Sequence, residues 1–199
     1  MKEKSAEKKP AAFTGKATYN EDALNAFCKV QFAAFRRSMQ VFVVLLGLAL
    51  IVLAVCGVVS GGVSIIIGAL GCWIITLPGV FPKSDADKLI HAMNGKFSTS
   101  VYSFDDKGFD IVAGKDTNHL GYDNMIRLIE DDYYFFFFAT PKLAYIVEKM
   151  SIRPEGTEKF KSYVSRRVGL EWTKARPWYS VNVRALVHER KNTRKIPKQ

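Results

Sequence analysis

One long stretch without charge constrains this chain more than any other feature. Residues 38–82 form a run of 45 positions that contains no Asp, Glu, Lys, Arg or His. A helix needs about 20 apolar residues to cross the hydrocarbon core of a bilayer, so the run is long enough for two crossings. Helices of soluble proteins keep a polar face, which this run lacks. We therefore predict a transmembrane helical hairpin with spans at residues 40–59 and 63–81.

Ser60, Gly61 and Gly62 separate the two predicted spans. Each glycine costs about 1 kcal/mol relative to alanine inside a helix, so these residues favour a tight turn between antiparallel helices. Lys and Arg occur on both flanks of the uncharged run and are absent from the turn. Because cytoplasmic flanks carry the excess of Lys and Arg, both chain ends are predicted to be cytoplasmic.

Small residues recur along both predicted spans. They occur every seven residues on the first span and every four on the second, at Gly47, Ala54, Gly61 and at Ser64, Gly68, Cys72. Small side chains let helix backbones approach closely. The pattern favours packing of the two helices within the hairpin, and it leaves assembly with a second copy or another membrane protein as the alternative.

Three segments flank the hairpin. Residues 1–16 are polar without apolar periodicity, which predicts disorder. Residues 17–37 predict a juxtamembrane amphipathic helix that begins after a capping Asn20. Residues 83–95 predict a separate connector helix, because Pro78 and Pro82 are expected to end the second span.

Residues 96–168 change to a strand-like pattern. Short β-prone runs alternate with turn residues, at 96–104, 109–113, 118–122, 125–130, 133–139 and 143–148. Pro154 then opens a segment in which Phe160 and Val164 recur at helical spacing. The pattern predicts a six-stranded antiparallel meander capped by one C-terminal helix. The expected fold class is thus membrane α+β, a two-helix transmembrane hairpin followed by a small antiparallel β domain.

Two local features of this domain carry sharper predictions. Asp105 to Gly108 form a hairpin loop in which Gly108 is expected to take a positive φ. Tyr133 to Phe138 place three aromatic rings on each face of one strand. We expect both faces to be buried, with an exposed aromatic patch as the alternative.

The order of these segments is similar to that of a known family. Apolar helices and a strand pair precede the run Tyr122–Glu130, the aromatic strand Tyr133–Phe138, the run Ala144–Val147 and a closing helix with Phe160. Over residues 17–168 this layout resembles the YcxB-like family of small bacterial membrane proteins. The resemblance implies a domain of the pleckstrin-homology type, which is an antiparallel barrel capped by a helix. It also implies a bacterial plasma-membrane location, and it brings no established activity with it.

Catalytic and metal-binding patterns are not found in the sequence. His91, His119 and His188 lie in separate segments, without metal-ligand spacing to a Cys or a carboxylate. There is no phosphate-cradling glycine loop and no nucleophile motif. We expect no catalytic activity, no cofactor and no bound metal.

Basic charge is concentrated at the two ends of the chain. The net charge is +4 over residues 1–37, −3 over 83–149 and +9 over 150–199. The tail at 169–199 mixes Trp with Lys and Arg, a combination typical of membrane interfaces. Nucleic acid would suit the same composition, but a membrane tether makes anionic lipid the simpler partner. The predicted lipid or interface contacts are Arg36, Arg37, Trp172, Lys174, Arg176 and Trp178.

These observations lead to two functional hypotheses. The first is a noncatalytic, membrane-anchored cytoplasmic module that binds a protein partner or anionic lipid headgroups. The alternative is a structural subunit of a membrane complex, or a homo-oligomer, assembled through the glycine-bearing hairpin.

Overall fold

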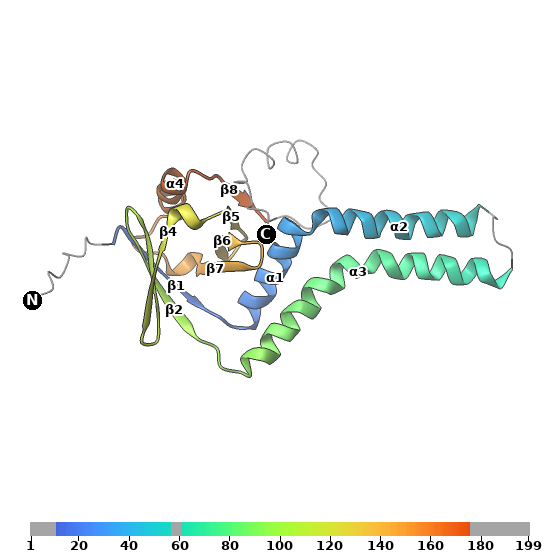
Figure 1. Cartoon of the computed structure of the whole chain (residues 1–199), viewed down its shortest axis with the longest axis horizontal. Coiled ribbons are helices and arrows are strands. Elements are labelled where there is room, and N and C mark those ends of the chain that lie inside the picture. The colour runs from blue at the N-terminus through green and yellow to red at the C-terminus, as the bar shows by residue number, and fades with distance from the viewer. Residues whose placement is uncertain (1–10, 57–60, 176–199) are drawn as a thin grey trace, which may run out of the picture. The chain divides into compact units, whose positions relative to one another are not determined.

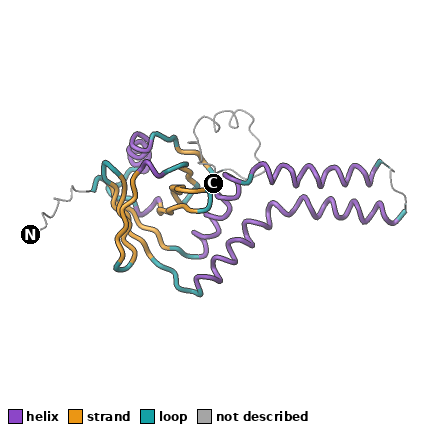
Figure 2. The backbone as a smooth tube through the Cα atoms, viewed as in Figure 1, coloured by secondary structure: helices purple, strands orange, loops and turns teal. Residues whose placement is uncertain are grey.

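The computed structural model describes residues 11–56 and 61–175, which fall into two compact units. The first unit, the β domain, comprises residues 11–23 and 97–174. The second, the helical unit, lies within residues 24–96. Figures 1 and 2 show the elements along the chain. The helical unit is therefore inserted into the sequence of the β domain.

The first sheet of the β domain has four antiparallel strands in the order β1-β2-β3-β4. They are β1 (Phe13–Thr18), β2 (Thr99–Phe104), β3 (Gly108–Ala113) and β4 (Asp116–Gly121). β1 pairs with β2 over its whole length, from Phe13 opposite Phe104 to Thr18 opposite Thr99. The strands that precede and follow the helical unit in sequence are thus direct neighbours.

The second sheet has the order β7-β6-β5-β8. Its strands are β5 (Arg127–Glu130), β6 (Tyr134–Thr140), β7 (Leu143–Glu148) and β8 (Trp172–Lys174). β8 runs parallel to β5, and the other pairs are antiparallel. Two short 3-10 turns, η1 (Tyr122–Asn124) and η2 (Lys149–Ser151), and the helix α4 (Thr157–Val168) complete the domain. Thr14 of β1 and Arg153, which follows η2, exchange backbone hydrogen bonds of 2.7 and 2.8 Å.

Aromatic rings fill the core of the β domain. Phe104 of β2 lies 5.6 Å from Phe137 of β6 and 4.9 Å from Phe160 of α4, measured between ring centroids. All three side chains are fully buried. Burying each such ring stabilises the fold by about 1.5–3 kcal/mol, so this cluster holds both sheets and α4 together.

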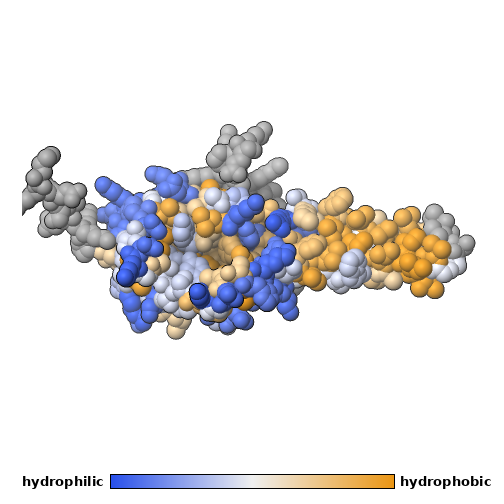
Figure 3. Space-filling view, turned by 60° about the horizontal axis from the view of Figure 1, so that its bottom comes forward, coloured by the Kyte–Doolittle hydropathy of each residue, from blue (hydrophilic) through white to orange (hydrophobic). Residues whose placement is uncertain are grey.

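The helical unit contains α1 (Glu21–Phe35), α2 (Arg37–Val55) and α3 (Gly62–Met93). α1 begins as predicted, because the Ala23 amide donates to Asn20 Oδ1 at 2.9 Å. α2 and α3 pack against each other, and both are long and apolar enough to cross a membrane. Only 11% of the apolar window of each helix is buried, so their apolar side chains face outward, as Figure 3 shows in orange.

The N-terminal segment differs from the prediction. Residues 1–10 lie outside the described residues, but residues 13–16, predicted to be disordered, are part of β1. The buried positions of β1 are Gly15 and Ala17, which carry little hydrophobic signal. Its partner β2 follows only after the whole helical unit, so local pattern could not reveal the pairing.

The six predicted strands are confirmed as β2 to β7, with shifted boundaries, but the single meander is wrong. β4 and β5 do not pair, because η1 separates them and the chain starts a second sheet. β1 and β8 add one strand to each sheet. The capping helix is confirmed and begins at Thr157, three residues after Pro154.

The second apolar helix does not end at its prolines. α3 continues through Pro78 and Pro82 to Met93, so the predicted separate connector at 83–95 is its last part. Apolar surroundings offer freed backbone groups no alternative partner, and proline then bends a helix more readily than it ends one. Figure 1 shows α3 as one helix that bends along its length. It stops where Asn94 and Gly95 adopt left-handed φ values of 52° and 71°.

The aromatic strand is buried on both faces, which confirms the favoured interpretation. Phe135, Phe136, Phe137 and Phe138 are all fully buried, whereas Tyr133 precedes the strand and is 73% exposed. Phe135 and Phe137 face the core and contact Phe160 at 5.3 and 6.4 Å.

Candidate functional site

The residues predicted to contact lipid fall in both units. Arg36, between α1 and α2, pairs with Asp85 at 3.5 Å and lies 5.7 Å over the ring of Phe32. Arg37 is the first residue of α2. Lys174 of β8 is exposed and lies 3.6 Å from Asp132. Arg176 and Trp178 lie outside the described residues.

Trp172, predicted to belong to the tail, is part of β8 in the β domain. Its ring lies 4.6 Å from Phe135 and 5.4 Å from Phe137, and its Nε1 donates to the Lys161 carbonyl at 3.1 Å. The predicted lipid contact of Trp172 stays a prediction. Trp beside Lys occurs both at membrane interfaces and in edge strands, so the composition alone did not reveal β8. The parallel pairing of β8 with β5 joins segments far apart in the sequence, so no local sequence pattern predicts it.

The small residues of the hairpin lie mostly between α2 and α3. A Cβ on Gly47 would come within 2.6 Å of Ile75 Cγ1 and 2.8 Å of the Gly71 carbonyl oxygen. Farther along, Ser64 donates to the Ala54 carbonyl at 2.5 Å, and a Cβ on Gly68 would meet Ala54 at 3.5 Å. Gly61 and Cys72 are exposed and do not take part, whereas Gly71 does and was missed because it breaks the four-residue spacing.

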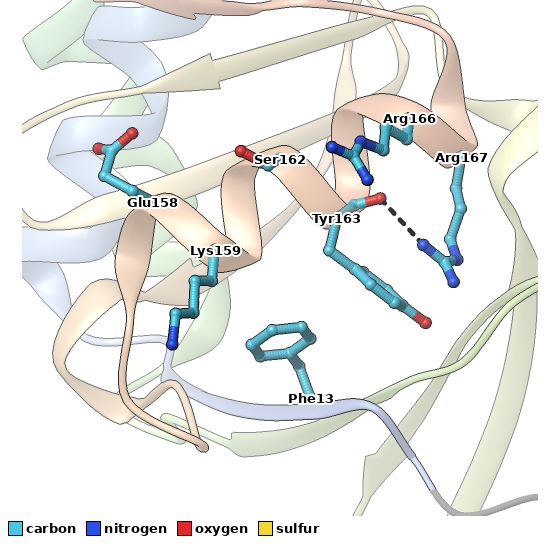
Figure 4. A pocket seen from close by; sticks show the side chains of 7 residues that line it. All are labelled: Phe13, Glu158, Lys159, Ser162, Tyr163, Arg166 and Arg167. Carbon is cyan, nitrogen blue, oxygen red and sulfur yellow. Dashed lines mark hydrogen bonds between the residues drawn. The ribbon is translucent and has the colours of Figure 1, made fainter.

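An open groove lies along α4 of the β domain. Helical spacing buries Phe160, Val164 and Val168 on one side of α4. The opposite side exposes Lys159, Ser162 and Arg166, at intervals of three and four residues. Figure 4 shows the lining side chains, namely Phe13, Glu158, Lys159, Ser162, Tyr163, Arg166 and Arg167.

Arg167 is already engaged at one side of this groove. Its guanidinium lies 3.5 Å over the Tyr163 ring and pairs with Asp106 of the β2–β3 loop. It also donates to the Tyr163 carbonyl at 3.4 Å, the dashed line in Figure 4. The buried Tyr163 hydroxyl has no hydrogen-bond partner of good geometry among the described residues. Burial and nearby Asp106 raise the Tyr163 pKa against the opposing effect of Arg167, so the hydroxyl stays neutral.

Unlike Arg167, three other side chains of the groove are not engaged with described residues, namely Lys159, Ser162 and Arg166. Their side chains make no ion pair and no hydrogen bond with any other described residue. The acidic residue of the lining, Glu158, is directed to Lys161 at 3.3 Å. The groove therefore offers two cations and a hydroxyl group along one side of a helix, beside the aromatic ring of Phe13.

A half-buried ion-pair network fixes α4 from its other side. Glu130 of β5 accepts from Lys149 of η2 and Lys161 of α4, each at 2.7 Å. Burial raises the Glu130 pKa, but the two lysines outweigh it and hold the pKa below its usual value. Glu130 thereby ties β5, η2 and α4 together and sets the position of the groove. The sequence placed Glu130 at the end of the predicted strand 125–130, and its two lysine partners were not predicted.

His119 and the acidic turns have other partners, and His188 lies outside the described residues. His119 Nδ1 lies 2.7 Å from Asp110 Oδ1 across the β3–β4 pair. Asp105 and Asp131 accept hydrogen bonds from backbone amides within their own turns, at 2.6–2.8 Å. Within residues 11–56 and 61–175, no group of three His, Cys, Asp or Glu side chains could hold a metal ion.

Comparison with known proteins identifies a family match within the β domain. Residues 104–164 match the family model described as YcxB-like protein. The matched range runs from the last residue of β2 through β3 to β7 and most of α4. No match was found among curated proteins or among solved structures. The resemblance predicted from the sequence is confirmed over this range, and residues 104–164 form a YcxB-like segment of the chain.

Proposed function

We propose that this chain is a membrane-anchored binding module. In this proposal α2 and α3 cross a bacterial plasma membrane as a hairpin, with both chain ends in the cytoplasm. The β domain, as a domain of the pleckstrin-homology type, contacts anionic lipid headgroups or a protein partner at that surface. Its role is to bind and not to catalyse.

The observation that carries the anchor is the outward apolar surface of α2 and α3. Val55, Ile65 and Phe42 are 79%, 76% and 66% exposed. Transfer of each such side chain from water into an apolar environment is favourable by about 1.5–3 kcal/mol. Lipid hydrocarbon is the environment that suits two adjacent helices with this surface and no charge between Ser38 and Pro82.

The topology of the β domain supports the pleckstrin-homology assignment. One antiparallel sheet of β1 to β4 is followed by a second sheet that starts with β5 to β7, and then by α4. This is the layout of an antiparallel barrel capped by a C-terminal helix. The helical unit between β1 and β2 and the parallel β8 are additions to that layout.

Binding to an anionic surface is supported by the charge on α4. Lys159 and Arg166 have no partner among the described residues, and Lys161 and Arg167 lie on the same helix. The cytoplasmic leaflet carries a negative surface potential that attracts such groups by about 1 kcal/mol per cation.

Hydrogen exchange of the full chain in lipid nanodiscs tests this function. Discs of phosphatidylcholine alone are compared with discs that also contain phosphatidylglycerol. Amides of the β domain, including α4, should exchange more slowly in the anionic discs. The difference should shrink between about 0.1 M and about 1 M salt, because the Debye length falls from about 10 to 3 Å. Identical exchange in both discs at every salt concentration would reject lipid binding.

The alternative function, a structural subunit assembled through the glycine-bearing helix faces, has less support. Gly47 and Gly71 already face each other within one hairpin, so these positions are not free for a second helix. We therefore retain the binding module as the proposal.

A further inference from the structure

The groove on α4 has a geometry that suits one group with two negative charges. Lys159 and Arg166 are seven residues apart, which is about 10 Å along a helix axis, and they lie on the same face. Both side chains are long enough to bend toward a group placed between them, above the Ser162 hydroxyl. Figure 4 shows the Phe13 ring next to Lys159 and Tyr163, with Ser162 and Arg166 farther from that ring along α4.

Two acidic side chains near these cations have other partners. Glu158 pairs with Lys161, and Asp106 pairs with Arg167. The engaged Arg167 in turn holds the Tyr163 ring by stacking, so the wall of the groove is fixed before any ligand arrives. The site is thus positively charged, and one wall of it is already in place.

Phosphate matches this arrangement better than carboxylate does. A carboxylate is satisfied by the fork of a single Arg, whereas a phosphate monoester carries close to two charges and three acceptor oxygens. Arg166, Lys159 and Ser162 offer donors for all three oxygens. The adjacent Phe13 ring provides an apolar wall for carbon atoms next to the phosphate.

The links between the two units favour a lipid as the source of that phosphate. Only residues 94–98 join α3 to β2, and only residues 19–20 join β1 to α1. In the proposed function the β domain is joined through these short links to helices that cross a bilayer, so headgroups are present at high effective concentration.

We propose that the α4 groove binds the phosphate monoester headgroup of phosphatidic acid, held between Lys159 and Arg166 over Ser162. The inference rests on the proposed function and names the ligand of its basic surface.

Calorimetric titration of the full chain in phosphatidylcholine nanodiscs tests the site. The probes are glycerol 3-phosphate, inorganic phosphate and a phosphoserine peptide. Glycerol 3-phosphate should bind saturably and more tightly than the other two. The double variant Lys159→Ala/Arg166→Ala should weaken its binding about tenfold or more, because two charge-assisted contacts are lost.

The matched control is Lys115→Ala/Lys142→Ala, which removes two exposed cations outside the groove. It should leave the affinity unchanged, and thermal unfolding should show that both double variants are folded. Three outcomes overturn the proposal: no saturable binding of glycerol 3-phosphate, equal weakening by both double variants, or tighter binding of inorganic phosphate or the phosphopeptide.

Failure of this site differs from failure of the proposed function. If anionic discs slow exchange in the β domain while glycerol 3-phosphate does not bind, the surface function stands and the groove is rejected. If anionic discs change nothing, the surface function itself is rejected.

Discussion

At Gly108 the main chains of β3 and β4 approach each other unusually closely. A Cβ at this position would collide with the Leu120 carbonyl oxygen and come within 2.9 Å of its carbon. The sequence pointed to this glycine for another reason, a positive φ in the hairpin loop. That reason is wrong, since Gly108 is not among the glycines with positive φ. The loop itself is as predicted, closed by Asp105.

Gly108→Ala should destabilise the protein by about 1–3 kcal/mol, because the added methyl group meets backbone that cannot move aside. The control is Gly121→Ala directly opposite in the register, where the nearest atom is 3.7 Å away and φ is −73°. That change should be neutral or slightly stabilising. Thermal unfolding of both variants in detergent checks the pair, and equal stability of the two would contradict the assignment.

Glu130 is the residue whose charge matters most to the position of α4. Its side chain is 13% exposed, and its partners Lys149 and Lys161 are 17% and 20% exposed. An ion pair this sheltered is sensitive to removal of one partner, because the other charges remain desolvated. The sequence placed Glu130 at the end of a predicted strand, and nothing local indicates that lysines 19 and 31 residues away converge on it.

Glu130→Gln should lower the stability by about 1–3 kcal/mol at neutral pH. The exposed pair of Asp132 and Lys174 supplies the control, and Asp132→Asn should change stability by less than about 1 kcal/mol. Because the Glu130 pKa is lowered in the folded state, its contribution is present above about pH 4.3, the unfolded value, and is lost as pH falls through the folded pKa. Unfolding temperatures from pH 7 to pH 3 should therefore converge for wild type and Glu130→Gln, and a constant difference would refute this.

Among the elements, those with strong local patterns were predicted and those held by distant partners were not. The apolar helices, six strands and α4 follow from periodicity, caps and turn residues. β1 and β8 are short, half-polar strands whose partners lie about 85 and 45 residues away along the chain. For the same reason the groove was missed, since it needs Phe13 from β1 beside α4. Only the basic character of this part of the chain was evident from the sequence.

The contact between α2 and α3 yields a prediction at this scale. Gly47→Ala should weaken the hairpin by about 1–3 kcal/mol, because the added carbon meets the Gly71 carbonyl and Ile75. Gly79→Ala is the matched control on α3, since no atom lies within 4 Å of its Cβ position. Alanine favours a helix over glycine by about 1 kcal/mol, so the control should be neutral or stabilising. Denaturation in mixed detergent micelles measures both, and a stable Gly47→Ala variant would contradict the close contact.

For the whole molecule, the main consequence of the structure is that the β domain is discontinuous in sequence. Residues 11–23 complete a unit whose remainder begins at residue 97. The domain limits of 96–168 predicted from the sequence omit β1 and β8, one strand from each sheet. The family match at 104–164 likewise covers the continuous part. The helices α1 to α3 lie in sequence between β1 and β2, which pair with each other. No local sequence pattern reveals that pairing.

A soluble fragment of residues 96–175 should therefore fail to unfold cooperatively, because β2 loses its partner strand and Phe104 loses cover. A chain that joins residues 11–20 to 97–175 through a flexible Gly/Ser linker should fold. Circular dichroism melts and amide NMR spectra compare the folding of the 96–175 fragment with that of the linked chain. A well-folded 96–175 fragment would show that β1 is dispensable.

The central claim is that α2 and α3 form a membrane hairpin with the β domain on the cytoplasmic side. Two-sided cysteine labelling of the full chain in oriented vesicles tests it most directly, after replacement of Cys28, Cys56 and Cys72 by Ser. Gly62→Cys, at the start of α3, and Lys115→Cys, in the β3–β4 turn, are each treated with a membrane-impermeant maleimide. The account predicts that Gly62→Cys reacts only from the outer side and Lys115→Cys only from the cytoplasmic side. Reaction of both positions from the same side would contradict it.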